Sequence, residues 1–68
     1  MRTFVNAMMG EANGANLQAE IYQEESGYSI TYSINGQNVK AEQFPNKSIY
    51  FVEDAAENWL SGIKKLNG

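Results

Sequence analysis

Apolar and polar residues alternate strictly through the middle of the chain. A period of two residues is typical of a β-strand with one buried face. The pattern predicts strands at 17–24 and 28–35. One face of the first strand carries Leu17, Ala19, Ile21 and Gln23, and one face of the second carries Tyr28, Ile30, Tyr32 and Ile34. The turn between them lies at Glu25-Ser26-Gly27. Ile21 and Ile30 share a face only if this loop has an even number of residues.

The dipeptide Asn35-Gly36 predicts a tight hairpin after the second strand. Both residue types accept the positive φ angles that a two-residue type I′ turn requires. The turn places Ile34 opposite Gln37, Tyr32 opposite Val39, and Ile30 opposite Ala41. Because the apolar sides of both segments then coincide, a third strand is predicted from Gln37 to Phe44.

Beyond the third strand, Phe44-Pro45-Asn46-Lys47 predicts a second turn, because proline cannot donate a ladder hydrogen bond. The next segment, 48–52, is β-branched and aromatic, which favours a short fourth strand. The alternative is that the last helix already starts here, with Ser48 as its N-cap.

A C-terminal helix follows from an apolar stripe at helical spacing. Acidic residues early in this segment and lysines late in it favour the helix dipole. Asn67-Gly68 would end the helix. The stripe consists of Val52, Ala55, Ala56, Trp59, Ile63 and Leu66.

The first sixteen residues lack this regularity. Residues 1–11 form an N-terminal segment with scattered apolar groups, in which Thr3 could cap a short helix. Residues 12–16 are small and polar, as in a flexible linker. The predicted fold is α+β: one domain at 17–68, with a four-stranded antiparallel β-meander and one C-terminal helix packed on one face.

Composition excludes several kinds of chemistry. The 68 residues contain no cysteine and no histidine, so disulfides, thiolate sites and the usual neutral-pH base are absent. The net charge of −3 and the scattered bases disfavour nucleic-acid binding. No apolar run approaches the ~20 residues that span a bilayer, and residues 4–9 are too short and polar for a secretory signal.

Candidate chemical groups have simpler structural interpretations. Glu24 and Glu25 are adjacent, so they point apart in a strand and are expected to be solvated turn charges. The early helical carboxylates could hold a hard cation, but an acidic helix start needs no metal. The aromatic residues of the two central strands and the helix could stack on a ligand, although their spacing favours core positions. We expect no catalytic residue, no cofactor and no metal site.

One group of large apolar residues has no core position in this arrangement. If the loop around Pro45 has four residues, Tyr50 and Val52 join the core. The side chains left on the face without a helix are Phe44, Ile49 and Phe51, with Tyr22 a weaker fourth candidate. Exposed apolar patches commonly mark an interface, so these four are the candidate partner-binding residues. The alternatives are an odd-numbered loop, or cover by the N-terminal segment.

The start of the chain carries a further pattern. Met1-Arg2-Thr3-Phe4, followed by Met9-Gly10-Glu11-Ala12, resembles the capsid-targeting peptide of internal head proteins in T-even-type tailed phages. The resemblance implies cleavage by a prohead protease before Ala12. The segment from Leu17 to Leu66, and residues 52–59 above all, looks like small uncharacterised proteins of related marine phages. The family implies packaging with the genome and action on a host protein in the host cytoplasm.

These observations favour a non-enzymatic accessory protein that binds a protein partner, either a host protein or a second copy of itself. One alternative is a structural, self-assembling homo-oligomer, most simply a homodimer joined through the edge of the fourth strand. A second alternative is a module for a small ligand or nucleic acid, which the acidic balance disfavours.

Overall fold

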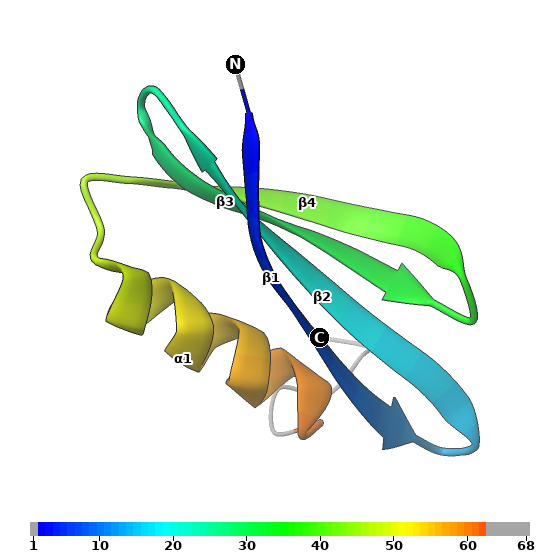
Figure 1. Ribbon diagram of the computed structural model, residues 1–68. Coiled ribbons are helices and arrows are strands. Elements are labelled where there is room, and N and C mark those ends of the chain that lie inside the picture. The colour runs from blue at the N-terminus through cyan, green and yellow to red at the C-terminus, as the bar shows by residue number, and fades with distance from the viewer. Residues whose placement is uncertain (1, 63–68) are drawn as a thin grey trace.

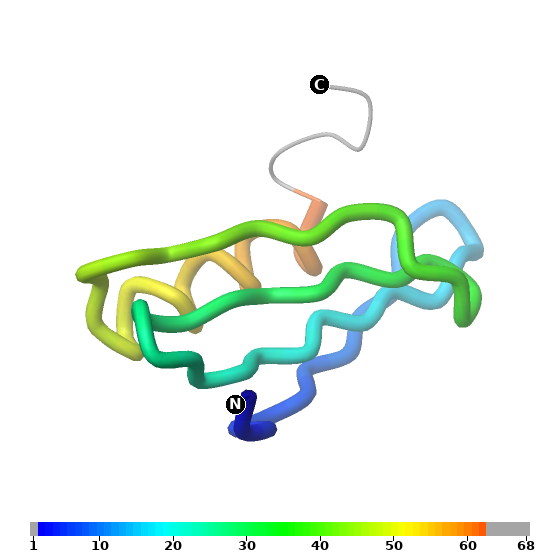
Figure 2. Tube along the Cα trace, turned by 90° about the horizontal axis from the view of Figure 1, so that it is seen from above, coloured from blue at the N-terminus to red at the C-terminus, as the bar shows by residue number. Residues whose placement is uncertain are grey.

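The computed structural model describes residues 2–62, which form four strands and one helix in the order β1-β2-β3-β4-α1. The strands build one antiparallel sheet in chain order, and α1 lies across one of its faces (Figures 1 and 2). The predicted α+β class, a four-stranded meander with a C-terminal helix, is confirmed. The elements are β1 Thr3–Ala12, β2 Ala15–Glu24, β3 Gly27–Ile34, β4 Gln37–Pro45 and α1 Ile49–Leu60.

The strands are not the four that were predicted, because the N-terminal segment supplies one of them. Residues 3–12 form β1 and pair with β2 along their length. The predicted linker at 12–16 is wrong, since it holds a two-residue turn at Asn13-Gly14. Asn13 has φ 53° and Gly14 φ 81°, nearly the angles of Asn35 (53°) and Gly36 (85°). The chain thus uses the same turn twice.

The predicted fourth strand at 48–52 is also wrong, and the alternative helix start is correct. Ser48 is the N-cap of α1, and its Oγ accepts a 3.2 Å hydrogen bond from the Phe51 N–H. Helical spacing buries Val52, Ala56 and Leu60 on the sheet. This burial outweighs the β propensity of the segment.

The helix is shorter than predicted. The Ser61 N–H donates to the Glu57 carbonyl, and Gly62 has a left-handed φ of 79°. This arrangement is a common way to end a helix. Ile63, Leu66 and the predicted stop at Asn67-Gly68 lie outside the described residues. No helix in the described part of the chain is long and apolar enough to cross a membrane.

The register of β2 and β3 agrees with prediction. Ile21 pairs with Ile30, and a two-residue loop, Glu25-Ser26, joins the strands. In the next hairpin Ile34 pairs with Gln37 as predicted, but a β-bulge follows. Tyr32 pairs with Lys40 rather than Val39.

The bulge changes which side chains of β4 meet the helix. Val39 is the extra residue and is 52% exposed. A one-residue shift moves every later side chain to the other face of the sheet. Lys40, Glu42 and Phe44 therefore point to the side of the sheet that α1 covers, which is called the helix face below.

The core lies between the helix face and α1. Its fully buried large side chains are Leu17, Ile21, Ile30 and Val52. The other face of the sheet, called the open face, is covered by no described element (Figure 1). Its two buried hydroxyls are satisfied locally: Ser29 Oγ donates to Glu24 Oε2, and Ser33 Oγ donates to Asn38 Oδ1, each at 2.8 Å.

Close backbone approach fixes two points of this packing. A Cβ on Gly10 of β1 would lie 3.1 Å from the Leu60 carbonyl oxygen, so the end of α1 rests directly on this strand. A Cβ on Gly27, which has φ 140°, would lie 2.6 Å from the Phe44 carbonyl oxygen. Glycine at position 27 thus allows β4 to run beside the start of β3.

Candidate functional site

A small hollow opens where α1 leaves β4 uncovered. The helix packs mainly on β1, β2 and β3, so the helix face of β4 remains partly open. This hollow has a volume of about 160 Å³ and is called the aromatic cleft. Its lining residues are Tyr32, Lys40, Glu42, Phe44, Phe51, Ala55 and Trp59.

Tyr32 and Trp59 form the inner end of the aromatic cleft. Their ring centroids lie 4.6 Å apart. The Tyr32 hydroxyl donates a 3.1 Å hydrogen bond to Glu42 Oε1. Burial of the ring, and secondarily the charge and hydrogen bond of Glu42, raise the pKa of the Tyr32 phenol well above its usual value. Tyr32 is therefore neutral at physiological pH and acts here as a hydrogen-bond donor.

Two phenylalanines form the outer wall of the cleft. Phe44 is only 6% exposed and meets Phe51 edge to face, with centroids 6.1 Å apart. Phe51 keeps 50% of its surface exposed. A half-exposed aromatic ring on a buried aromatic support is a common arrangement at protein interfaces.

Lysines border the aromatic cleft. Lys40 Nζ lies 5.7 Å from the centroid of the Tyr32 ring, and Lys47 Nζ lies 4.8 Å from that of Phe51. The Glu42 carboxylate is engaged by Tyr32. The cleft thus offers apolar walls and a border with two lysines and one carboxylate, that of Glu42, although the whole chain carries a charge of −3.

The four predicted partner-binding residues do not lie together. Phe44 and Phe51 meet in the aromatic cleft, but Phe44 is buried there, contrary to the expectation of an exposed patch. The cause is the bulge at Val39, which turns Phe44 to the helix face. Ile49 is half-buried against the core. Tyr22 lies on the open face.

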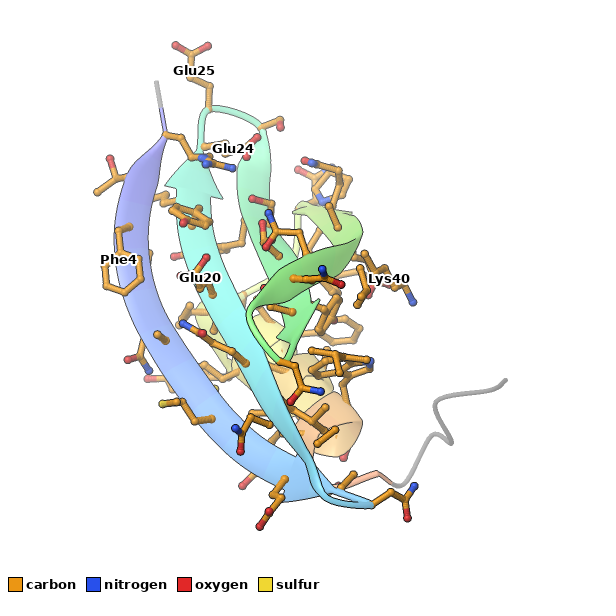
Figure 3. All side chains as sticks on the ribbon, turned by 90° about the vertical axis from the view of Figure 1, so that its right-hand side faces the viewer. Phe4, Glu20, Glu24, Glu25 and Lys40 are labelled. Carbon is orange, nitrogen blue, oxygen red and sulfur yellow. The ribbon has the colours of Figure 1, made fainter. Side chains whose placement is uncertain are left out.

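Tyr22 belongs to a second aromatic group, at one end of the open face. The Arg2 guanidinium carbon lies 3.9 Å from the centroid of its ring, and Phe4 contacts it edge to face at 5.8 Å. The Tyr22 hydroxyl donates to Glu20 Oε1 at 3.2 Å. Figure 3 shows Phe4 and Lys40 at opposite edges of the sheet. The open-face group is thus separate from the cleft.

The acidic residues of the helix are not at its start. Because α1 begins at Ile49, its first turn contains no acidic residue, and the predicted acidic cap is wrong. Glu53, Asp54 and Glu57 instead line a shallow hollow beside β1. Within residues 2–62 no group of acidic side chains is arranged to hold a metal ion.

The predicted cleavage site lies inside the sheet. Met9, Gly10, Glu11 and Ala12 pair with residues 15–18 of β2. A cut before Ala12 would separate nearly all of β1 from the chain.

Sequence reasoning assigned Tyr32 and Trp59 to the core, where both pack, but missed that they also line a cleft. The missed signal was the spacing of Phe51, Ala55 and Trp59, a second helical stripe beside Val52, Ala56 and Leu60. Only a helix that begins at Ile49 reveals this stripe.

Comparisons with protein-family models, curated proteins and solved structures find no match for this chain.

Proposed function

We propose that this chain is a non-enzymatic protein-binding module whose aromatic cleft receives an apolar side chain of a partner protein. The observation that carries the proposal is the half-exposed ring of Phe51, supported by Phe44 beside a hollow that also contains Tyr32 and Trp59. Aromatic anchors dominate binding energy at protein interfaces. An apolar side chain of a partner would contact phenylalanine, tyrosine and tryptophan rings in this cleft.

The charge around the aromatic cleft selects the partner segment. Lys40 and Lys47 border the hollow and outnumber its one carboxylate, that of Glu42, which accepts a hydrogen bond from the Tyr32 hydroxyl. A segment with carboxylates beside its apolar anchor matches this border, whereas a basic segment does not. The inferred partner is therefore a protein segment in which aspartate or glutamate flanks a large apolar residue.

The biological setting rests on the phage-like pattern of residues 1–12. In that setting the chain is a virus-encoded accessory protein, packaged in a virion or made in the host cytoplasm, that binds and redirects a host protein. The aromatic cleft supplies a surface for such binding without catalytic groups. The competing function is the binding of a small ligand or nucleic acid, and the following experiment distinguishes it from protein binding.

The test is an NMR titration of the full chain with three probes. The first is a peptide with one phenylalanine between two pairs of aspartates, the second carries lysines in place of the aspartates, and the third is oligothymidylate. We expect the acidic peptide to shift the amide signals of Phe44, Phe51 and Trp59, and to bind at least about tenfold more tightly than the basic one. Tighter binding of oligothymidylate, or shifts confined to the open face, would overturn the proposal.

A pair of helix variants provides the control. Phe51→Ser removes the outer wall of the cleft, whereas Tyr50→Ser changes a 79% exposed aromatic residue one position away, beside β1. We expect Phe51→Ser to abolish binding of the acidic peptide while the chain stays folded, and Tyr50→Ser to leave binding intact. If Phe51→Ser unfolds the chain, Lys40→Glu and Lys47→Glu test the same cleft from its border.

A further inference from the structure

The two edges of the sheet are protected very differently. The β4 edge carries Lys40, Glu42 and Pro45 and is distorted by the bulge at Val39. Charges, proline and bulges are the devices by which proteins prevent edge strands from pairing. The β1 edge has no charged residue from Thr3 to Gly10 and exposes Phe4 (56%) and Met9 (75%). The β1 edge also has a bulge, at Val5, and its Ala7 N–H donates to Asn6 Oδ1 at 2.9 Å. Because it carries neither charges nor proline over Thr3 to Gly10, it is still the more open of the two edges to another strand.

We propose that β1 is a dimerisation edge, on which two copies of this chain join antiparallel into one eight-stranded sheet. A second copy of the chain is the partner that fits this edge, because the order of side chains along β1 is self-complementary. A two-fold axis at Ala7, a small exposed residue, sets each half of the strand against the other half in the second copy.

The bulge in β1 fixes this register. The pairing with β2 shifts between Phe4 and Asn6, which leaves Val5 as the extra residue. Phe4 and Met9 therefore share the open face, because they pair with Tyr22 and Gln18 of β2. With the axis at Ala7, Phe4 of one copy lies opposite Met9 of the other on that face. Without the bulge these side chains would point to opposite faces.

Charge complementarity supports the same register. Two positions further out, Arg2 of one copy lies opposite Glu11 of the other, at both ends of the paired strands. Arg2 already lies on the open face, over the Tyr22 ring, and Glu11 follows Met9 by two positions on the same face. Opposite charges on facing strands stabilise the pair, whereas like charges destabilise it. No like charges face each other along β1 in this arrangement.

The dimer leaves the aromatic cleft free. Phe4 and Lys40 lie at opposite edges of the sheet (Figure 3), so pairing along β1 places the two clefts at the outer edges of the joined sheet. The inference does not depend on the proposed function of the cleft. It requires that residues 1–11 remain on the chain.

The test is the association state of the full chain, measured by sedimentation over a wide concentration range. We expect a concentration-dependent dimer. Ala7→Lys sets two lysines against each other at the axis and should weaken dimerisation by at least about tenfold. Ala41→Lys is the matched control, because it places a lysine at an exposed alanine of β4. We expect it to leave the dimer intact.

A charge exchange tests the register itself. Arg2→Glu or Glu11→Arg alone opposes like charges at both ends and should weaken the dimer several-fold, while the double variant should restore it. A chain that stays monomeric at all concentrations would overturn the proposal. So would a dimer that Ala41→Lys disrupts while Ala7→Lys does not, or a double variant weaker than both single ones. Retained dimerisation of Phe51→Ser separates this result from failure of the cleft proposal.

Discussion

At the residue scale, Tyr32 joins the core to the aromatic cleft. Its ring is 2% exposed and packs on Trp59, while its hydroxyl reaches Glu42 of the neighbouring strand. A buried hydroxyl without a partner would destabilise the fold by about 1–3 kcal/mol. The carboxylate of Glu42 therefore has a structural role, and it holds one wall of the cleft in place.

This environment makes the stability of the fold decrease at alkaline pH. The folded chain raises the pKa of Tyr32 above the value of 10.0 that the unfolded chain has. Above that pH the unfolded state loses the phenolic proton while the folded state keeps it. The free energy of unfolding therefore falls as pH rises from 10 toward the folded pKa, and is unaffected by this group below pH 10.

We expect Tyr32→Phe to lower stability at pH 7 by about 1 kcal/mol through the lost hydrogen bond, and to flatten the decline above pH 10. Denaturant unfolding at several pH values between 7 and 11 measures both effects. Tyr50→Phe, at an exposed position, is the control and should keep the decline. An equally steep decline in Tyr32→Phe would show that other groups cause it.

At the element scale, the bulge in β4 determines what the cleft contains. Val39 adds one residue between Asn38, which pairs with Ser33, and Lys40, which pairs with Tyr32. Without Val39 the same pairs can form in a regular ladder, and Phe44 stays on the helix face. Loss of a residue after the bulge would instead move Phe44 to the open face as long as the bulge persists.

Two deletions distinguish these cases. We expect deletion of Val39 to leave the chain folded, with Phe44 still buried and a midpoint of unfolding within a few degrees of the parent. Deletion of Ala41, an exposed residue of the same strand, should remove Phe44 from the core and destabilise the chain by about 3 kcal/mol, as core truncations of phenylalanine do. Thermal unfolding followed by circular dichroism measures both. A larger loss on deleting Val39 than on deleting Ala41 would contradict this role of the bulge.

The same elements show how far sequence reasoning reaches. The strands β2 and β3 were predictable because strict alternation and the Asn35-Gly36 turn agree. The strand β1 was not, because the bulge at Val5 breaks its period and Asn6 and Gly10 are not apolar although they lie on the helix face. The bulge in β4 left no local signal, since either register offers an apolar residue to the core. The start of α1 was ambiguous because only its packing on the sheet decides between two propensities. Because the start of α1 was not the favoured prediction, the aromatic cleft was not predicted either.

At the scale of the whole molecule, stability depends on the N-terminal strand. Met8 and Ala12 of β1 pack against the core, and Gly10 contacts the end of α1. A single core in a chain of this size supplies only about 3–5 kcal/mol. Separation of β1 would expose one side of β2 and remove support from the helix, so β1 is an integral part of the fold.

This dependence makes the phage-like cleavage pattern testable. We expect a chain of residues 12–68 to be largely unfolded, because β2 would become a bare edge and Leu17 would lose its neighbour Gly10. Heteronuclear NMR of this chain, compared with the full chain, measures the effect. Addition of a separate peptide of residues 1–11 is the control: it should restore native signals if strand pairing is what was lost. A truncated chain with the stability of the full one would show that β1 is dispensable. In that case, a protease could remove it from the folded protein at no cost to the fold.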